Sequence, residues 1–212
     1  MQNNDTPSAA TPSLLALRDF LTFLTGRSLA SFSERMIMIA VGVQIYDLTN
    51  DPAALGWVGF CLFLPAAILI LPAGDLADRF DRRILLGLAY AGLALGAGAL
   101  LTLTLSGVTD PKPYYSALLA ISVAKSVTRP AGQSFLPFLV PRSFLPNAIA
   151  WNASMNQVIT IGGPVMAGYI YLRWGPAAAY ATATAFYLAA ALSFTTLRVG
   201  GYKPSGDEPK TN

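Results

Sequence analysis

The sequence predicts an all-α membrane protein with six transmembrane helices, and three observations lead to that fold class. Of its 212 residues, 54% are hydrophobic and 12% are charged, about half the charged fraction of an ordinary soluble domain. The mean hydropathy is +0.50. The charges are clustered, and between the clusters lie six apolar stretches, each long enough to supply the roughly 20 residues that cross a bilayer.

The predicted spans follow one another with short connections. They cover residues 18–46, 53–73, 84–106, 114–138, 147–172 and 177–198. The polar start of the chain does not resemble a cleaved signal peptide, and residues 1–17 are expected to form a disordered cytoplasmic tail. Residues 199–212 are rich in proline, glycine and charge, and we expect them to form a solvated linker.

The positions of lysine and arginine predict the orientation of the bundle, because cytoplasmic loops carry an excess of positive charge. With the N-terminus inside, the cytoplasmic segments hold eight such residues: Arg18, Arg79, Arg82, Arg83, Arg142, Arg198, Lys203 and Lys210. The opposite loops hold two, Lys112 and Arg173. Both termini are therefore expected on the cytoplasmic side.

The scarcity of two residue types excludes several classes of function. The chain has no histidine, which excludes Ser/His and Cys/His nucleophilic catalysis and every metal site that contains histidine. Its single cysteine, Cys61, lies in an apolar run and is expected to be a small buried hydrophobic residue. We therefore predict no enzyme activity, no cofactor and no metal site.

The ten residues from Gly74 to Arg83 carry six charges between two uncharged runs. Gly74 is expected to let the chain leave the second span in a tight turn, and Asp81 to cap the N-terminus of the third. Asp75 and Arg79 are four residues apart and would pair if the helix continued that far. This segment is expected to be a short cytoplasmic loop.

The pattern of this loop, GxLADRxxRR, resembles the GxLADRxGRR consensus between the second and third helices of major facilitator superfamily transporters, with Asp81 in place of glycine. The resemblance implies that Gly74, Asp78, Arg79, Arg82 and Arg83 form a conformational loop that docks on a C-terminal half. It also implies a bacterial cytoplasmic (inner) membrane protein. The implied partners are the lipid bilayer, a small-molecule substrate, protons, and a C-terminal six-helix half or a second six-helix chain, with no nucleic acid.

A weak internal repeat fits that family. Trp57 precedes Gly74 by seventeen residues, and Trp151 precedes Gly168 by the same number. The second and fifth spans would then be equivalent members of two three-helix inverted repeats. Coincidence is the alternative, because alanine and glycine are common in this chain.

The fifth span carries a second resemblance. Residues 162–168 resemble the GPxxGG segment of drug–proton antiporters through Gly163, Pro164 and Gly168, with Ala167 in place of one glycine. This resemblance favours export, whereas the alternative is an ordinary packing seam of small residues. Upstream, Asn152 and Asn156 continue to Thr160 as a polar stripe that either contacts substrate or forms interhelical hydrogen bonds, and we favour hydrogen bonds.

The first span carries two charges on one face. Arg27 and Glu34 are seven residues apart with Ser31 between them, and a helix turns 100° per residue. Each charge at bilayer depth costs roughly 2.5 to 3.5 kcal/mol, so a partner or a watery cavity is expected. Arg35 points elsewhere and is expected to pack on another helix or to reach toward the membrane surface. The spacing resembles the RLxSxxGD pattern of bacterial drug and siderophore exporters.

The fourth span offers partners for that carboxylate. Lys125 and Arg129 share a face before Pro130, and the resemblance implies that the first and fourth helices line one cavity. Glu34 would pair with either cation, as a proton carrier or as a fixed ion pair that only stabilises packing.

Aromatic residues near the span ends are expected to be membrane-interface anchors. They are Tyr46, Trp57, Tyr114, Tyr115, Trp151, Tyr171 and Trp174.

The leading hypothesis is the N-terminal half of a proton-coupled exporter of small amphipathic molecules that works by alternating access. The alternative is a truncated or isolated six-helix protein without transport activity.

Overall fold

The computed structural model describes residues 18–136, 139–140 and 142–196, without the side chains of residues 70, 71, 77–79, 82, 133, 134 and 142. The described part consists of helices and short connections and contains no strand, which confirms the all-α class. Its elements are α1 (Arg18–Thr49), α2 (Pro52–Arg79), α3 (Arg82–Leu105), α4 (Lys112–Phe135), a short 3₁₀ helix (Arg142–Phe144) and α5 (Leu145–Thr196). The predicted tail and linker lie outside the described residues.

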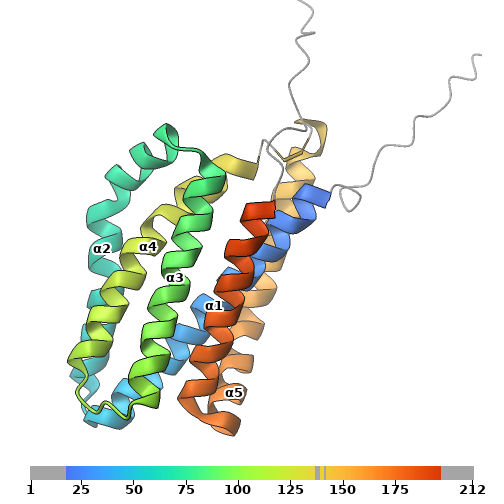
Figure 1. Ribbon diagram of the computed structural model, residues 1–212. Helices are drawn as coiled ribbons and strands as arrows, with labels where there is room; N and C mark the ends of the chain where they lie inside the picture. Colours follow the sequence, from blue (N-terminus) through green and yellow to red (C-terminus); the bar gives the residue numbers. More distant parts are fainter. Residues whose placement is uncertain (1–17, 137–138, 141, 197–212) are drawn as a thin grey trace, which may run out of the picture.

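Helix α5 consists of two antiparallel arms joined at Gly175. Gly175 has φ 80° and ψ 177°, a backbone conformation that residues with a Cβ avoid. Pro176 follows, and proline is favoured in the first turn of a helix. The chain therefore reverses at this point, and the two arms appear in Figure 1 as the orange and red rods.

Four of the described helices are long and apolar enough to cross a membrane. They are α1, residues Pro52–Leu69 of α2, residues Arg83–Leu105 of α3, and α5, which the reversal at Gly175 divides into two rods. Helix α4 has the length of a span but contains Lys125 and Arg129, and it is not among the four. These helices confirm the membrane class.

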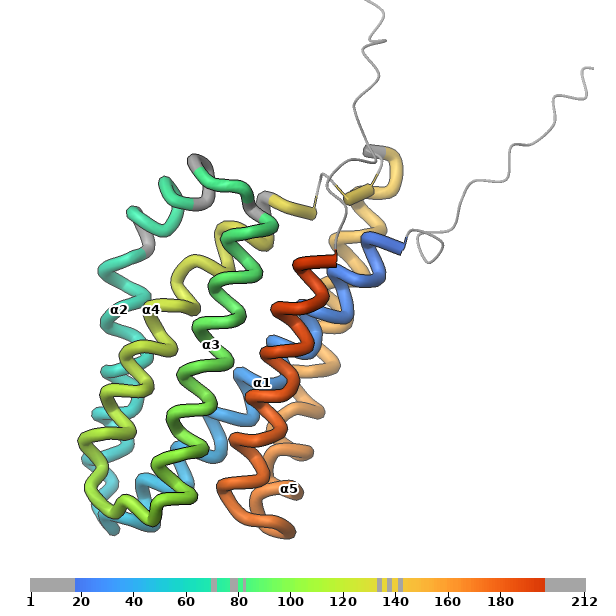
Figure 2. The backbone as a smooth tube through the Cα atoms, viewed as in Figure 1, coloured from blue at the N-terminus to red at the C-terminus, as the bar shows by residue number. Residues whose placement is uncertain are grey.

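The packing of the helices fits two inverted repeats. Helix α1 packs chiefly on α5, α2 packs chiefly on α4, and α1 and α2 make little contact with each other. If α1 corresponds to α4 and α2 to the first arm of α5, the α1–α5 contact is the counterpart of the α2–α4 contact. The two proposed equivalents, α2 and residues 145–174, run in opposite directions along the bundle (Figure 2).

An aromatic cluster packs four helices together at the end of the bundle where α1 begins. Phe23 of α1 lies 5.9 Å, between ring centroids, from both Phe135 of α4 and Phe194 of α5. Tyr90 of α3 stacks on Phe194 at 5.1 Å. All four rings are at least 96% buried, so the cluster ties the start of α1 to the ends of α4 and α5.

A small polar network lies in the other half of the bundle. The amide nitrogen of buried Gln44 donates to Thr104 Oγ1 at 3.1 Å and to the Tyr114 hydroxyl at 3.2 Å. The Tyr114 hydroxyl in turn donates to the carbonyl of Val108. The prediction of Tyr114 as an interface anchor was wrong: the ring is fully buried, and its hydroxyl is one of the hydrogen-bond partners that the buried amide of Gln44 needs.

The connection between α2 and α3 is shorter than predicted. Helix α2 continues through Gly74 to Arg79, and only Phe80 and Asp81 lie between the helices. The expectation of a turn at Gly74 was wrong, since no helix-breaking residue follows it before Arg79 and the chain first becomes extended at Phe80. The predicted cap is confirmed: the Asp81 side chain accepts a 2.9 Å hydrogen bond from the Arg83 backbone N–H.

Two further predictions have different outcomes. Cys61 is buried and free, as expected. The side chains of Asp78, Arg79 and Arg82 lie outside the described residues, so the predicted Asp75–Arg79 pair and most of the loop pattern stay predictions.

Candidate functional site

An ion pair joins α1 to α4. Glu34 Oε1 lies 2.7 Å from Lys125 Nζ, and about 40% of each side chain is exposed. Of the two pairings expected for Glu34, the structure therefore forms the one with Lys125. Arg129 lies one helical turn further along α4 and is exposed.

Arg27 reaches across from α1 to the end of α4. A Cβ atom added at Gly132 would collide with Nη1 of the Arg27 guanidinium. The absence of a side chain at Gly132 therefore makes room for the guanidinium against the α4 backbone. Gly132 was not among the residues predicted from the sequence, because its role depends on how α1 and α4 pack.

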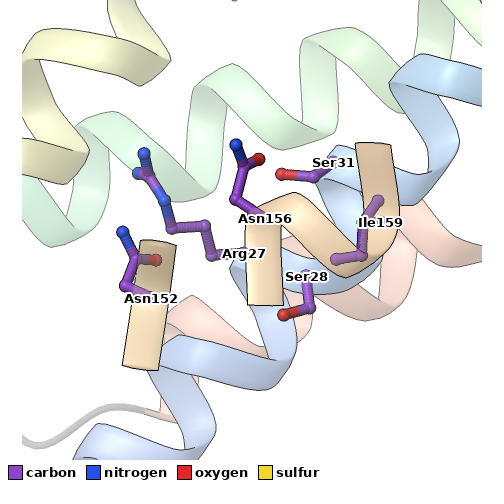
Figure 3. A pocket seen from close by; sticks show the side chains of 6 residues that line it. All are labelled: Arg27, Ser28, Ser31, Asn152, Asn156 and Ile159. Atoms are coloured by element: carbon purple, nitrogen blue, oxygen red, sulfur yellow. The ribbon is translucent and has the colours of Figure 1, made fainter. Parts of the chain in front are cut away.

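A small polar pocket surrounds Arg27. It is lined by Arg27, Ser28 and Ser31 of α1 and by Asn152, Asn156 and Ile159 of α5 (Figure 3). The pocket is shallow and open to the outside, with a free volume of about 10 Å³, roughly the room that one water molecule needs. Its polar side chains are therefore reached from the open side of the pocket, and the pocket does not enclose a ligand.

The polar stripe of α5 divides between two environments. Asn152 and Asn156 line the pocket, whereas Thr160 Oγ1 accepts a hydrogen bond from Arg35 Nη2 at 3.3 Å. Arg35 thus packs on another helix, one of the two outcomes expected for it. A Cβ atom at Gly163 would lie 3.0 Å from Arg35 Cβ and 3.1 Å from Arg35 Cγ, so Gly163 allows α1 and α5 to approach closely.

The rest of the antiporter-like segment makes looser contacts. Nothing lies within 4 Å of a Cβ atom placed at Gly168, and Pro164 lies inside the continuous first arm of α5. The structure thus gives a packing role to Gly163 of this segment.

The charged groups of α1 and α4 share one face of the bundle. Arg27 and Glu34 are seven residues apart on α1, which places their backbones roughly 10 Å apart along the helix axis. The polar pocket and the ion pair are therefore neighbouring features.

Comparison with known proteins shows the family to which the chain belongs. The model of the Major Facilitator Superfamily matches residues 23–212. The chain belongs to the major facilitator superfamily. This confirms the resemblance inferred from the loop after α2, and it makes the chain a member of a family of multi-pass membrane transporters.

Several relatives within the superfamily come from bacteria. The chain is 25% identical to macrolide efflux protein A of Streptococcus pyogenes over 73% of its own length and 38% of the relative's. It is 28% identical to the staphyloferrin A transporter of Staphylococcus aureus, with 72% and 39% covered. It is 32% identical to an uncharacterized MFS-type transporter of Mycobacterium tuberculosis, with 73% and 34% covered.

The chain thus matches between about one third and two fifths of these superfamily members. No solved structure matches it significantly.

Proposed function

We propose that the chain forms the N-terminal half of a proton-coupled secondary exporter of small amphipathic molecules. The observation that carries the proposal is the Glu34–Lys125 ion pair, which joins two helices of the membrane bundle. Ionisable side chains inside a membrane protein mark ion or substrate pathways, because their burial in lipid is costly. A pair that links α1 to α4 can couple a proton to a change in helix packing.

The mechanism follows from the charge on Glu34. When Glu34 is ionised, its carboxylate holds Lys125 at 2.7 Å and the two charges neutralise each other. When Glu34 takes up a proton, the attraction is lost and Lys125 needs another partner or water. Protonation therefore favours a different arrangement of α1 and α4, as alternating access requires.

A second six-helix unit would complete the transport path. The chain matches less than half of each relative, and a substrate path between two halves needs both. The unit is a C-terminal half or a second six-helix chain. The loop residues Gly74, Asp78, Arg79 and Arg82 would dock on this unit and stabilise one conformational state. Arg83 would support the same loop from the end of α5, to which its side chain is hydrogen-bonded.

The direction of transport is taken from two indications. One relative is named as a macrolide efflux protein and another as a staphyloferrin A transporter. The antiporter-like segment with Gly163, Pro164 and Gly168 also favours export. We therefore propose a drug-type or siderophore-type substrate that leaves the cell as protons enter.

The proposed location is the bacterial inner membrane, with both termini in the cytoplasm. The start of α1, the α2–α3 connection and the end of α5 lie at the same end of the bundle (Figure 2). Arg18 and Arg83 belong to this end, while Lys112 begins α4 at the other. Positive residues gather on the cytoplasmic side of membrane proteins.

The test compares Glu34→Gln with the wild type in the full-length protein. Inverted membrane vesicles are energised with a pH gradient, and uptake of a fluorescent efflux substrate is followed. We expect the variant to lose proton-driven uptake but to retain substrate exchange without a gradient, because a glutamine side chain keeps the polar contact but cannot take up or release the proton. Asp19→Asn, which removes a carboxylate from the first turn of the same helix, is the matched control and should transport normally.

Unchanged proton-driven uptake by Glu34→Gln would refute the role of Glu34. Membership in a transporter family speaks against both the alternative of a six-helix protein without transport activity and an enzyme. If the purified full-length protein moves no substrate across liposomes, that result would instead support the six-helix protein without transport activity.

A further inference from the structure

We propose that Arg27, Asn152 and Asn156 form a subsite that binds a carboxylate group of the transported molecule. The inference rests on the proposed transport function for the origin of the ligand. Binding itself is tested independently of transport.

The pocket is rich in hydrogen-bond donors. Its lining contributes one guanidinium, two carboxamides and two serine hydroxyls, with Ile159 as the apolar member. A guanidinium has five N–H donors in a rigid fork and no acceptor, and each carboxamide adds an NH₂ group. In Figure 3 the side chains of Arg27 and Asn156 extend to the same side of the pocket. A planar carboxylate, with two acceptor oxygens, fits such a fork in a bidentate manner.

The charge balance of this face favours an anion. Glu34 and Lys125 neutralise each other at 2.7 Å. Among the side chains that the structure describes, neither Arg27 nor Arg129 forms an ion pair with a carboxylate. The face therefore carries excess positive charge within the membrane bundle, and a ligand carboxylate would compensate it.

The anion has two candidate sources, a soluble ligand and a lipid headgroup. Arg27 lies nine residues after the start of α1 at Arg18, which corresponds to roughly 14 Å along the helix. Helix α1 has 32 residues, about 48 Å, and so extends beyond a hydrocarbon layer of about 30 Å. Depth therefore does not separate a soluble carboxylate from a lipid phosphate, and the experiment below distinguishes them.

Gly132 gives the proposal a structural control. A methyl group at this position would occupy the space of the Arg27 guanidinium. The clash involves the end of a flexible side chain, which can move away without disturbing the backbone. Gly132→Ala should therefore displace the guanidinium while the charge and the fold are retained.

The experiment measures binding of citrate and benzoate to the purified full-length protein in nanodiscs of phosphatidylcholine. Their neutral methyl esters serve as ligand controls. The variants are Arg27→Gln, Gly132→Ala and Asn156→Ala. Arg173→Gln, which removes an exposed positive charge beside the reversal at Gly175, is the matched control.

We expect at least one of the two carboxylates to bind and its ester not to bind. Arg27→Gln should weaken binding about tenfold or more, as loss of a charge-assisted hydrogen bond does. Gly132→Ala and Asn156→Ala should weaken it by smaller factors, and Arg173→Gln should bind like the wild type.

Several results would overturn the subsite. The first is that the wild-type protein binds neither carboxylate at millimolar concentration. The second is that an ester binds as well as its acid. The third is that Arg27→Gln and Arg173→Gln weaken binding equally. Loss of citrate and benzoate binding when anionic phosphatidylglycerol is added would assign the pocket to a lipid headgroup instead. Protein that binds a carboxylate but transports nothing would refute the transport function and leave the subsite standing.

Discussion

The Arg83 side chain, at the start of α3, donates a hydrogen bond from Nε to the backbone carbonyl oxygen of Phe194 at 3.0 Å. Its Nη2 also donates to the carbonyl of Thr195. The last four carbonyl groups of a helix have no partner within the helix, and a cation there interacts favourably with the helix dipole. Arg83 therefore caps the end of α5 from a different helix, a role that its place in the loop pattern did not reveal.

Replacing Arg83 by Gln should loosen the end of α5. The loss of charge-assisted hydrogen bonds at a partly exposed site is expected to cost about 1 kcal/mol. Hydrogen exchange measured by mass spectrometry should show faster exchange in residues 190–196 and no change in α2. Arg18→Gln, which removes an exposed positive charge at the same end of the bundle, should leave that exchange unaltered. Equal exchange in Arg83→Gln and wild type would contradict the capping role.

The Glu34–Lys125 pair should contribute little to stability. Both side chains are about 40% exposed, and partly exposed ion pairs are typically worth about 1 kcal/mol or less. A double-mutant cycle with Glu34→Gln and Lys125→Gln, read by thermal unfolding in detergent, should therefore give a small coupling energy. A coupling energy of several kcal/mol would contradict this expectation and would show that the pair also holds the two helices together.

Gly163 and Gly162 should respond differently to alanine. At Gly163 a Cβ atom would press on Arg35, whereas at Gly162 nothing lies within 4 Å. Alanine stabilises a helix by about 1 kcal/mol relative to glycine, so Gly162→Ala should be neutral or slightly stabilising. Gly163→Ala should lose about 1 to 2 kcal/mol relative to that control, since close-packed sites tolerate extra volume poorly. Thermal unfolding of both variants checks the difference, and equal midpoints would contradict it.

Gly175→Ala should destabilise the reversal between the two arms of α5. With φ at 80° and ψ at 177°, a residue with a Cβ is strained by about 1 to 3 kcal/mol. Gly168→Ala is the control, because its Cβ would meet nothing within 4 Å. We expect a lower unfolding temperature for the first variant alone. Equal unfolding temperatures of Gly175→Ala and Gly168→Ala would show that the backbone at residue 175 relaxes to accept a Cβ atom.

Much of the fold was predictable because bilayer chemistry acts on composition. Long apolar stretches must become helices in lipid, since each backbone polar group needs a partner within its own segment. The predicted cap at Asp81 was also a local matter, because it depends on residues 81–83 alone. Gly74 was misjudged for the opposite reason: glycine permits a turn but does not require one, and the surrounding residues continue the helix.

The candidate site was predictable only in part. The charges Arg27, Glu34 and Lys125 stand out in apolar spans, so sequence alone could select them. The choice of Lys125 rather than Arg129 as the partner of Glu34 depends on how α1 crosses α4. The space that Gly132 leaves for Arg27 depends on the same crossing.

By itself, the sequence determined the membrane class, the approximate spans and the family, because these follow from composition and from local motifs. Only the tertiary structure decided that Tyr114 is buried with Gln44, that Arg35 bonds Thr160 and that Arg83 caps α5. The physical reason is that such contacts join residues that are from tens of positions to more than one hundred apart in the chain. Their geometry is set by how the helices pack, and a local sequence pattern carries no information about that packing.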